Sequence, residues 1–494
     1  MTHPQGPELV LDGSSLTAAQ VSALARREAV ATVDPDARRR VSAARAAAER
    51  VTARRLVYGH TTGVGANRTT GIPADAADRH GLRLLRSHSG GVGPLLPREQ
   101  VRAMLAVRLN QVLGADQALG DGVGEALAQA LATGHLPAVH ALGAIGTADL
   151  TALAELGLTL AGELPWQEPE SGTAWGSAPT PVALTRWDAL PLMSSSALTI
   201  GQSALAATDL KRLLDRVPLV AALTLTAVRG GTEAFAASVH ARRPHPGAQH
   251  TAARMRQLLT GADWSPVLVQ DPFGFRCLPQ VHGAALDSWS ALDAVLGVEL
   301  NASVENPLLD LDPDQPGRED YLHHGGFHMA TLALALDQFR LALLGTVSLA
   351  TARLGVVVEP SFTGGLPPFL AVAEDGSSGI MIVEYAAQSA LAELRGGAQP
   401  VTLGHPVISR GVEEHASFAS TGGRRLLDAV EPAALVLGCE LLAAVRALRM
   451  RQLQPPSEEL REFLAAAAKV LPAELEDRRL TDDIHAAAEL LLSR

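Results

Sequence analysis

A nearly continuous run of apolar residues, from Thr331 to Leu354, is the feature that most limits what this chain can fold into. Its length and its alanine and leucine content predict one long helix. Asp337, Arg340 and Arg353 interrupt the run, and each of these side chains is costly at the centre of a bilayer. A helix that is apolar on most sides has to be covered by other helices. We therefore expect a buried helix of a bundle and no membrane span.

Helical periodicity continues through most of the remaining chain. Strand signals are sparse, because runs of β-branched residues are short and aromatic residues make up 3% of the sequence. Asp34-Pro35 separates two helices expected between residues 17 and 55, since aspartate caps a helix and proline opens one. The fold class is therefore predicted to be all-α. Further helices are expected at 101–113, 204–214, 218–228, 249–259 and 283–300.

The composition of the chain limits which binding partners and which cellular compartment we expect. The net charge of −11 and the pI of about 5.8 argue against a nucleic-acid or anionic-membrane partner. Two cysteines, Cys277 and Cys439, are too few for a disulfide framework, and the first residues lack a signal-peptide pattern. We therefore expect a cytoplasmic protein whose partner is a small-molecule substrate.

Two glycine-containing stretches fall outside the helical pattern. The segment Val57 to Arg68, VYGHTTGVGANR, cannot form a regular helix and contains Tyr58, one of three tyrosines. The segment Gly143 to Gly157, GAIGTADLTALAELG, is predicted to be a loop followed by a helix.

Both stretches resemble motifs of the histidine and phenylalanine ammonia-lyase family, to which the chain is similar from about residue 20 to its C-terminus. In that family, the sequence Gly-x-x-Gly-Ala-Ser-Gly-Asp-Leu-Ala-Pro-Leu builds an electrophilic methylidene-imidazolone group (MIO) from its Ala-Ser-Gly triad. Further matches follow in the same order: Tyr58-Gly59, Thr62 to Gly65, Ser87-His88, Arg108 to Asn110, Arg243 to Gly247, Val269 to Pro272, Arg276 to Gln280, Glu299 to Asn301, Asn306-Pro307, Phe327-His328, Gly365 to Phe369 and Asp477-Arg478.

The resemblance implies a particular architecture. It is an all-α, long-helix bundle of the ammonia-lyase/fumarase-like type with an N-terminal, loop-rich active-site region. We accordingly expect an N-terminal active-site-loop domain at 1–200, and a central helical bundle with C-terminal helices at 201–494. The resemblance also implies a homotetramer in which each active site is shared between subunits.

The resemblance further assigns chemical roles to four residues. Tyr58 matches a loop tyrosine that removes the β-proton, Glu413 an acid/base glutamate, and His88 a histidine near the substrate. Arg276 matches the arginine that holds the substrate carboxylate, a role that suits its planar guanidinium. Each also has a structural alternative: a loop anchor for Tyr58, a helix-end cap for His88, a pair with Asp271 for Arg276, and surface charge for Glu413.

Several positions depart from the family pattern, and they lie on MIO or its polar neighbours. Gly146, Thr147 and Ala148 stand where the family has its triad and one preceding residue, so the loop is one residue short. In MIO formation the nitrogen of the third residue attacks a carbonyl carbon, and the Cβ of an alanine obstructs that approach. Gly326 replaces an asparagine. The expected substrate-binding residues are Arg276, Gln202 in place of an asparagine, Phe273 in place of a tyrosine, Phe327 and Gln280.

These departures lead to an expectation of catalysis without MIO or another cofactor. A placed base supplies roughly 10² to 10⁴-fold, and enzymes need about 10⁶-fold or more, so the substrate would have to carry its own activation. The expected function is elimination, isomerisation or addition-type cyclisation of an activated small molecule in specialised metabolism. Two alternatives stay open: a histidine-type aromatic amino acid ammonia-lyase, and a non-catalytic binding or scaffold protein. No metal site is expected, because His323, His324 and His328 have no carboxylate or cysteine partner at usable spacing.

Overall fold

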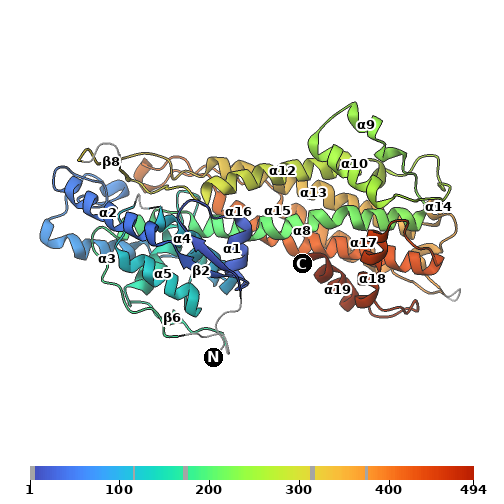
Figure 1. The fold of residues 1–494 in the computed structure, drawn as a ribbon, viewed down its shortest axis with the longest axis horizontal. Coiled ribbons are helices and arrows are strands. Elements are labelled where there is room, and N and C mark those ends of the chain that lie inside the picture. The colour runs from blue at the N-terminus through green and yellow to red at the C-terminus, as the bar shows by residue number, and fades with distance from the viewer. Residues whose placement is uncertain (1–5, 115–116, 171–175, 312–316, 373–375, 494) are drawn as a thin grey trace. The chain divides into compact units, whose positions relative to one another are not determined.

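The computed structural model describes residues 6–114, 117–170, 176–311, 317–372 and 376–493. It is mostly helical with a few short strands, which confirms the predicted fold class (Figure 1). The chain forms two compact units, neither of them contiguous in sequence. We call residues 1–208, 293–336 and 400–427 the loop unit, and residues 209–292, 337–399 and 428–494 the bundle unit. The predicted division into 1–200 and 201–494 stays a prediction.

The loop unit is built around one fully covered helix, α4 (Arg98–Leu113), whose residues from Val101 onward are all buried. Helices α1, α2 and α5 pack against it. The other helices are α1 (Ala18–Ala25), α2 (Pro35–Thr52), α3 (Ala77–His88), α5 (Asp121–Thr133), α6 (Leu150–Leu160), α7 (Ala189–Met193) and α16 (Ala419–Asp428), together with the beginning of α8 (Ala197–Val228) and of α13 (Ala330–Val358).

Short strands in the loop unit form two-stranded ribbons that fix its loops. β1 and β2 are parallel, with Glu8 opposite Val30, and the other three pairs are antiparallel. The strands are β1 (Glu8–Leu11), β2 (Val30–Val33), β3 (Val92–Leu95), β4 (Leu136–Pro137), β5 (His140–Leu142), β6 (Trp166–Gln167), β7 (Leu308–Asp310) and β8 (Asp320–Leu322). Each ribbon ends after a few residues, as the scarcity of β-branched runs predicts.

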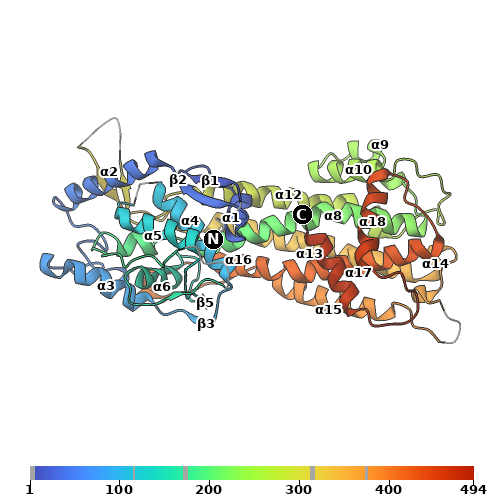
Figure 2. The same ribbon diagram turned by 60° about the horizontal axis from the view of Figure 1, so that its bottom comes forward.

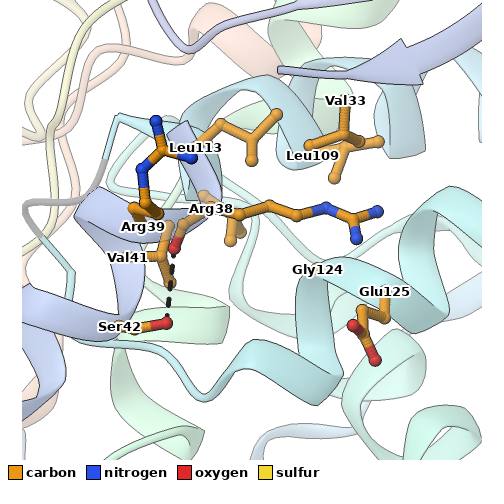
Figure 3. A pocket seen from close by; sticks show the side chains of 10 residues that line it. Val33, Arg38, Arg39, Val41, Ser42, Leu109, Leu113, Gly124 and Glu125 are labelled. Carbon is orange, nitrogen blue, oxygen red and sulfur yellow. Dashed lines mark hydrogen bonds between the residues drawn. The ribbon is translucent and has the colours of Figure 1, made fainter. Parts of the chain in front are cut away.

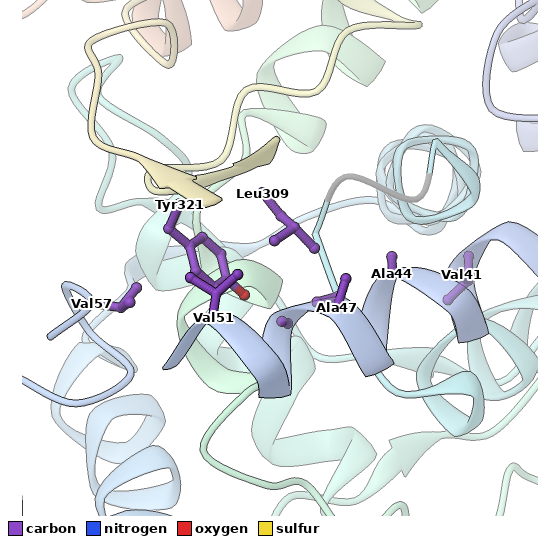
Figure 4. Packing of buried hydrophobic residues seen from close by; sticks show 9 residues of the cluster. Val41, Ala44, Ala47, Val51, Val57, Leu309 and Tyr321 are labelled. Carbon is purple, nitrogen blue, oxygen red and sulfur yellow. The ribbon is translucent and has the colours of Figure 1, made fainter. Parts of the chain in front are cut away.

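The predicted break at Asp34-Pro35 is confirmed. The Asp34 side chain accepts the backbone N–H of Asp36 at 3.0 Å, and Pro35 occupies the first turn of α2, where its missing N–H costs nothing. One face of α2, formed by Val41, Ala44 and Val51, then packs under the ribbon of β7 and β8 (Figure 4). Tyr321 of β8 covers this cluster, so the hydrophobic core holds β8 beside the loop that starts at Val57.

The bundle unit consists mainly of long helices. α17 (Val430–Arg451) packs against α15 (Met381–Gly397) and α19 (Thr481–Leu492) (Figure 2). The unit also contains the rest of α8 and α13, most of α12 (Leu278–Glu299), and α9 (Ala237–Ala241), α10 (Pro246–Leu258), α11 (Phe273–Arg276), α14 (Pro360–Thr363) and α18 (Glu458–Val470).

The charges in the long apolar segment are paired inside the protein. Arg353 of α13 donates Nε and Nη2 to both carboxylate oxygens of Glu440 on α17, at 2.6 and 2.7 Å, and both side chains are fully buried. Asp337 and Arg340 form a second buried pair. By length and composition alone α13 could cross a membrane, and half of its most apolar window is buried within the protein. Its paired charges match the predicted bundle helix.

One helix boundary was predicted wrongly. Residues 204–214 and 218–228 were expected to form two helices, and instead α8 is one helix that runs through Pro218. Proline removes the hydrogen bond to the carbonyl of Leu214, one turn earlier. His282 of α12 lies against that carbonyl, and residues around Pro218 are buried, so packing compensates for the lost bond.

Candidate active site

Two cavities in the loop unit differ in the chemistry of their walls. The smaller, of about 180 Å³, lies between β2, α2, α4 and α5 and is lined mainly by apolar side chains, including Val33, Leu109 and Leu113 (Figure 3). Arg38 and Glu125 lie at its exposed edge. Among its lining residues there is no histidine, tyrosine or cysteine that could transfer a proton near neutral pH.

The larger cavity, of about 890 Å³, is rich in such groups. Five residues singled out from the sequence line it together, although they come from distant parts of the chain: Tyr58, Phe327, Glu413, and Thr147 and Ala148 of the loop that matches the MIO loop. The remaining lining residues are Leu56, Thr62, Gly65, Arg68, Thr69, Leu150, Leu190, Ser194, Asn306, His323, His324, Gly325, His328, Val412, Glu414 and His415. We take this cavity as the candidate active site.

The loop before α6 is held tightly at one wall of the cavity by the segment that leads into α16. The Ser417 hydroxyl donates to the carbonyl of Gly146 at 2.8 Å, and the backbone N–H of Phe418 donates to the carbonyl of Ile145 at 2.8 Å. Gly146 has a φ of 86°, and a Cβ built there would lie 2.2 Å from Ser417 Oγ. Only glycine fits this position.

The next residues of this loop combine strain with a buried carboxylate. Ala148 has a φ of 115°, which L-residues rarely adopt, and it is buried with its neighbour Asp149. The Asp149 carboxylate accepts the backbone N–H and the hydroxyl of Thr199, both at 2.8 Å. Burial raises the pKa of Asp149 to about 6, and the bonds from Thr199 oppose that rise. Thr147 and Ala148 are thereby fixed at the cavity surface.

Tyr58 faces the cavity from a loop whose backbone hydrogen bonds are made mostly within residues 57–72. Its hydroxyl oxygen accepts the backbone N–H of Gly65 at 2.7 Å, and its own backbone N–H donates to Nε2 of His323 at 3.3 Å. Burial raises the pKa of Tyr58 above its ordinary 10.0; the Gly65 N–H and Arg68 lower it, whereas Glu413 raises it further. The phenol is therefore protonated at neutral pH in the free protein.

Glu413 is presented by a tight turn. Ile408 and Glu413 form an antiparallel bridge, and Ser409, Arg410 and Gly411 between them all have positive φ. Gly65, at the end of the Tyr58 loop, lies against this turn, because a Cβ there would be 2.9 Å from Ser409 Oγ. The turn and the loop therefore bring a carboxylate and a phenol to the same cavity.

Four histidines also line the cavity, and two of them are hydrogen-bonded to each other. Nε2 of His328 lies 2.9 Å from Nδ1 of His415, so one ring donates and the other accepts. Burial, and next the neighbouring His415, lower the pKa of His328 below its ordinary 6.5. Within the described ranges, no group of three or more His, Cys, Asp or Glu side chains is arranged to hold a metal ion.

Two predicted residues of the loop unit do not line this cavity. His88 ends α3, and its Nδ1 lies 2.9 Å from the carbonyl oxygen of Leu84, the contact of a helix-end cap. Gln202 is buried on α8 and donates to Gln100 Oε1 at 2.8 Å. Their roles at a substrate stay predictions.

The other predicted substrate-binding residues belong to the bundle unit. Arg276 donates Nε to the carbonyl oxygen of Asp271 at 2.5 Å, and its guanidinium lies 4.8 Å from the centre of the Phe273 ring. Phe273 and Gln280 are exposed, and Gln280 lines a separate cavity of about 380 Å³ beside α10. None of the three lines the larger cavity of the loop unit.

Sequence reasoning missed several residues of the cavity wall. His323 and His324 were considered only as metal ligands, His328 was considered also as part of the Phe327-His328 motif, and Glu414 and His415 were given no role. The sequence did contain a useful signal for these residues. The three histidines lie in the polar loop 323–329, and Glu414 and His415 lie in the polar loop 405–418. Which of these side chains would face the cavity depended on contacts between loops far apart in sequence.

Three comparisons place this geometry among known proteins. A family model described as aromatic amino acid lyase matches residues 16–469. A histidine ammonia-lyase from Streptomyces coelicolor is 34% identical, with 97% of this chain and 95% of the relative covered. Among solved structures, histidine ammonia-lyase from Trypanosoma cruzi has a TM-score of 0.88 at 27% identity, covering 98% of this chain and 93% of its own. Ergothionase from Treponema denticola has a TM-score of 0.88 at 25% identity, covering 98% of both chains.

These similarities correct two expectations. A MIO-independent enzyme acting on an activated molecule is not supported, because relatives along nearly the whole chain are histidine ammonia-lyases. The associated role in specialised metabolism loses its basis as well. The expectation of no cofactor is also wrong, since such homologues use MIO as their catalytic group. Two residues, Thr147 and Ala148, are outweighed by some five hundred aligned positions.

Proposed function

Because the chain belongs to the aromatic amino acid lyase family, we propose that it is a histidine-type ammonia-lyase. The reaction removes a β-proton and the α-amino group of a free amino acid, which leaves ammonia and an α,β-unsaturated acid. The observation that carries the proposal is that Tyr58, Phe327 and Glu413 line one cavity in a chain that aligns with histidine ammonia-lyases along nearly its whole length.

Tyr58 is the proposed base for the β-proton. It is half-buried at the cavity wall, and its hydroxyl oxygen already accepts one N–H, from Gly65. Its raised pKa means that the free enzyme holds the proton on the phenol. A substrate ammonium between Tyr58 and Glu413 would oppose the effect of the carboxylate and favour ionisation of the phenol. Substrate binding and activation of the base are thereby coupled.

Glu413 is the proposed partner of the substrate's nitrogen groups. A carboxylate accepts hydrogen bonds from an ammonium or an imidazole N–H, and the bridge from Ile408 fixes its position. Phe327 supplies an apolar wall for an aromatic side chain. Together these contacts favour an imidazole-containing amino acid over a purely apolar one.

Arg276 is proposed to bind the substrate carboxylate from a second subunit. It lies in the bundle unit, and among the described residues its guanidinium donates only through Nε. Self-association is supported by the exposed apolar residues Met381, Ile382 and Tyr385 on one face of α15, spaced as neighbours on a helix. A cytoplasmic homotetramer with shared active sites is the assembly proposed.

MIO would belong in the loop at 146–148. The loop keeps a close-fitting cradle, in which Gly146 is clamped by Ser417 and Ala148 holds a positive φ. Thr147 and Ala148 nevertheless do not match Ala-Ser-Gly. Ala148 is the residue whose nitrogen would close the ring, and its Cβ would obstruct that approach. The roles proposed for Tyr58, Glu413 and Phe327 therefore do not depend on the group. Intact mass of the purified protein reports its formation directly, as a loss of two water molecules from the calculated mass.

The proposal is tested by ammonia release. Purified protein is incubated separately with L-histidine, L-phenylalanine and L-tyrosine, and ammonia is measured together with the ultraviolet absorbance of the conjugated acid. We expect turnover of L-histidine, with kcat/KM higher than for the two other amino acids. Equal turnover of all three would contradict the histidine assignment, and no ammonia from any of them would overturn the proposed activity.

A further inference from the structure

Two side chains beside the cavity, Tyr321 and His323, flank the loop that carries Tyr58. They are two residues apart at the end of β8, where the chain is extended, so both side chains leave the same side. Tyr321 faces His60, with ring centres 5.2 Å apart, and His323 faces Tyr58, with ring centres 6.4 Å apart and planes at 88°. The end of β8 therefore contacts the Tyr58 loop at two points.

The first contact is a fixed anchor. His60 is 1% exposed and stacks between Tyr321 and Trp187. Tyr321 in turn packs on the cluster around Val51 and Val57 (Figure 4). Burial lowers the pKa of His60 to about 4, so this ring stays neutral over the range in which most proteins are folded. The anchor is therefore insensitive to pH near neutrality.

The second contact is exposed and can change. His323 is open to solvent, and its Nε2 accepts the backbone N–H of Tyr58 at 3.3 Å. An imidazole nitrogen can accept this bond only while it carries no proton, so Nδ1 holds the ring proton in the bonded state. Protonation of Nε2 turns the acceptor into a donor that faces another donor.

From these contacts we infer that His323 is a positioning residue for Tyr58, which as a neutral imidazole holds the backbone of the base in place and on protonation releases it. The inference rests on the proposed role of Tyr58 in ammonia elimination. It means that low pH weakens the positioning of Tyr58, because the contact between His323 and Tyr58 is lost while the anchor at His60 stays in place.

The charges around His323 set the direction of this control. Burial, Arg55 and His324 lower the pKa of His323, and Asp320 raises it, with a net lowering from the ordinary 6.5. Arg55 is itself held by Asp320, with Nη1 2.9 Å from both carboxylate oxygens. The neutral, bonded form therefore persists to mildly acidic pH and is lost as the pH falls further. The other titratable residues on the walls of the cavity are Tyr58, Arg68, Glu413, Glu414, His328 and His415.

His324 does not share this behaviour, although it is the adjacent residue. Its Nδ1 accepts the backbone N–H of Gly326 at 2.8 Å, and its Nε2 donates to the carbonyl oxygen of Glu305 at 2.8 Å. Its ring nitrogens are engaged with backbone groups of Gly326 and Glu305, and among the described residues neither is hydrogen-bonded to the Tyr58 loop. The inference is therefore specific to His323.

Hydrogen exchange tests the inference without requiring turnover. Exchange of the Tyr58 amide is measured between mildly acidic and neutral pH and expressed as protection relative to the intrinsic rate. In the wild-type chain we expect protection to fall roughly fivefold as His323 becomes protonated. In His323→Gln, whose amide oxygen accepts the bond without titrating, protection should not change. The Thr61 amide, bonded to the Val57 carbonyl oxygen at 2.9 Å, is the internal control.

Activity supplies a second reading. His323→Phe keeps an aromatic ring and lacks the acceptor, so we expect kcat to fall roughly fivefold at every pH with little change in KM. His323→Gln should restore kcat at neutral pH and shift the acid limb of the profile to lower pH. His250→Gln, an exposed histidine on α10, is the matched control that should keep the wild-type profile.

The outcomes separate the two proposals. Equal acid loss of Tyr58 protection in wild type and His323→Gln would overturn the role of His323, whatever the activity. If exchange follows the prediction and no amino acid is turned over, the proposed activity fails while the contact itself is confirmed. Unchanged pH profiles in His323→Gln and His323→Phe would contradict the positioning role in an active enzyme.

Discussion

The two loops that meet at the cavity are held in opposite ways. The loop at 143–149 is clamped by buried hydrogen bonds, with Gly146 against Ser417 and Asp149 against Thr199. The Tyr58 loop is anchored at His60 and by backbone bonds within residues 57–72, whereas Tyr58 itself is held by the exposed bond to His323 and by the bond between its hydroxyl and Gly65. One wall of the cavity is therefore rigid and strained, and the other is adjustable. The difference suggests that the rigid loop sets the geometry of the reacting centre, and that the adjustable loop controls proton transfer.

The largest effect should come from the adjustable loop. Tyr58→Phe removes the proposed base, and we expect kcat to fall roughly 10² to 10⁴-fold, the usual contribution of a placed base. Circular dichroism and thermal unfolding should stay close to wild type, because Tyr58 is only half-buried and its ring is retained. Ser290→Ala, which removes an exposed hydroxyl group on α12, is the control. Full activity of Tyr58→Phe would remove the base from the mechanism.

Next in size is a change that breaks the rigid loop. Gly146→Ala places a Cβ 2.2 Å from Ser417 Oγ and 2.8 Å from the backbone nitrogen atoms of Phe418 and Ala419, at a φ of 86°. We expect the free energy of unfolding to fall by on the order of 3 kcal/mol, from overlap and backbone strain together. Urea unfolding of the variant and of wild type measures this difference in unfolding free energy. Gly90→Ala, where no atom lies within 4 Å, should be nearly neutral, and equal losses for the two would contradict the clamp.

The buried carboxylate of the rigid loop gives a pH-dependent prediction. Because burial raises the pKa of Asp149 from 3.8 to about 6, the folded chain binds this proton more tightly than the unfolded chain does. The stabilisation from this proton is fully present below pH 3.8, the pKa in the unfolded chain, and is lost as the pH rises through about 6. Asp149→Asn does not titrate and can still bond to both groups of Thr199.

The comparison of wild type with Asp149→Asn therefore changes with pH. From about pH 4 to about pH 7, the variant should gain on the order of 2 kcal/mol in unfolding free energy relative to wild type. Parallel urea titrations at the two pH values measure this gain. Asp215→Asn, at an exposed aspartate paired with Lys211 on α8, should show no comparable gain. A constant difference between Asp149→Asn and wild type would contradict the assigned pKa.

The smallest expected effect is a gain in stability. Ala148 is held at a φ of 115°, so Ala148→Gly relieves backbone strain, and we expect stabilisation by about 1 kcal/mol after the added entropy of the unfolded chain. Ala152→Gly, inside α6, should destabilise by about 1 kcal/mol instead. Differential scanning calorimetry compares the two. Destabilisation by both substitutions would mean that the backbone at Ala148 is not strained.

The sequence predicted the parts of this molecule that depend on local pattern. The helix periods located α2, α4 and α13, and the Asp34-Pro35 pair gave the start of α2 correctly. Family motifs also brought Tyr58, Phe327 and Glu413 to one site, because loops in a shared register keep their places on a shared fold. The continuity of α8 through Pro218 was missed, since it depends on His282 and on buried packing that no local signal records.

Other features of the site required the three-dimensional contacts. The bond from Tyr58 to His323 joins residues 265 positions apart, and nothing near either residue indicates it. The strain at Ala148 follows from clamps supplied by α8 and the segment before α16, so composition alone could not reveal it. Arg276 was identified from its motif, and its place in a different compact unit from Tyr58 became visible only in the structure.

The most direct test of the account is the product formed from L-histidine. Proton NMR during incubation with the purified protein follows the substrate, the two vinyl protons of imidazolylacrylate and, in parallel, released ammonia. We expect imidazolylacrylate and ammonia to appear in equal amounts as histidine disappears, and both to form roughly 10² to 10⁴-fold more slowly in Tyr58→Phe. Histidine that stays unchanged under conditions where the protein is folded would contradict the assignment of this chain as a histidine-type ammonia-lyase.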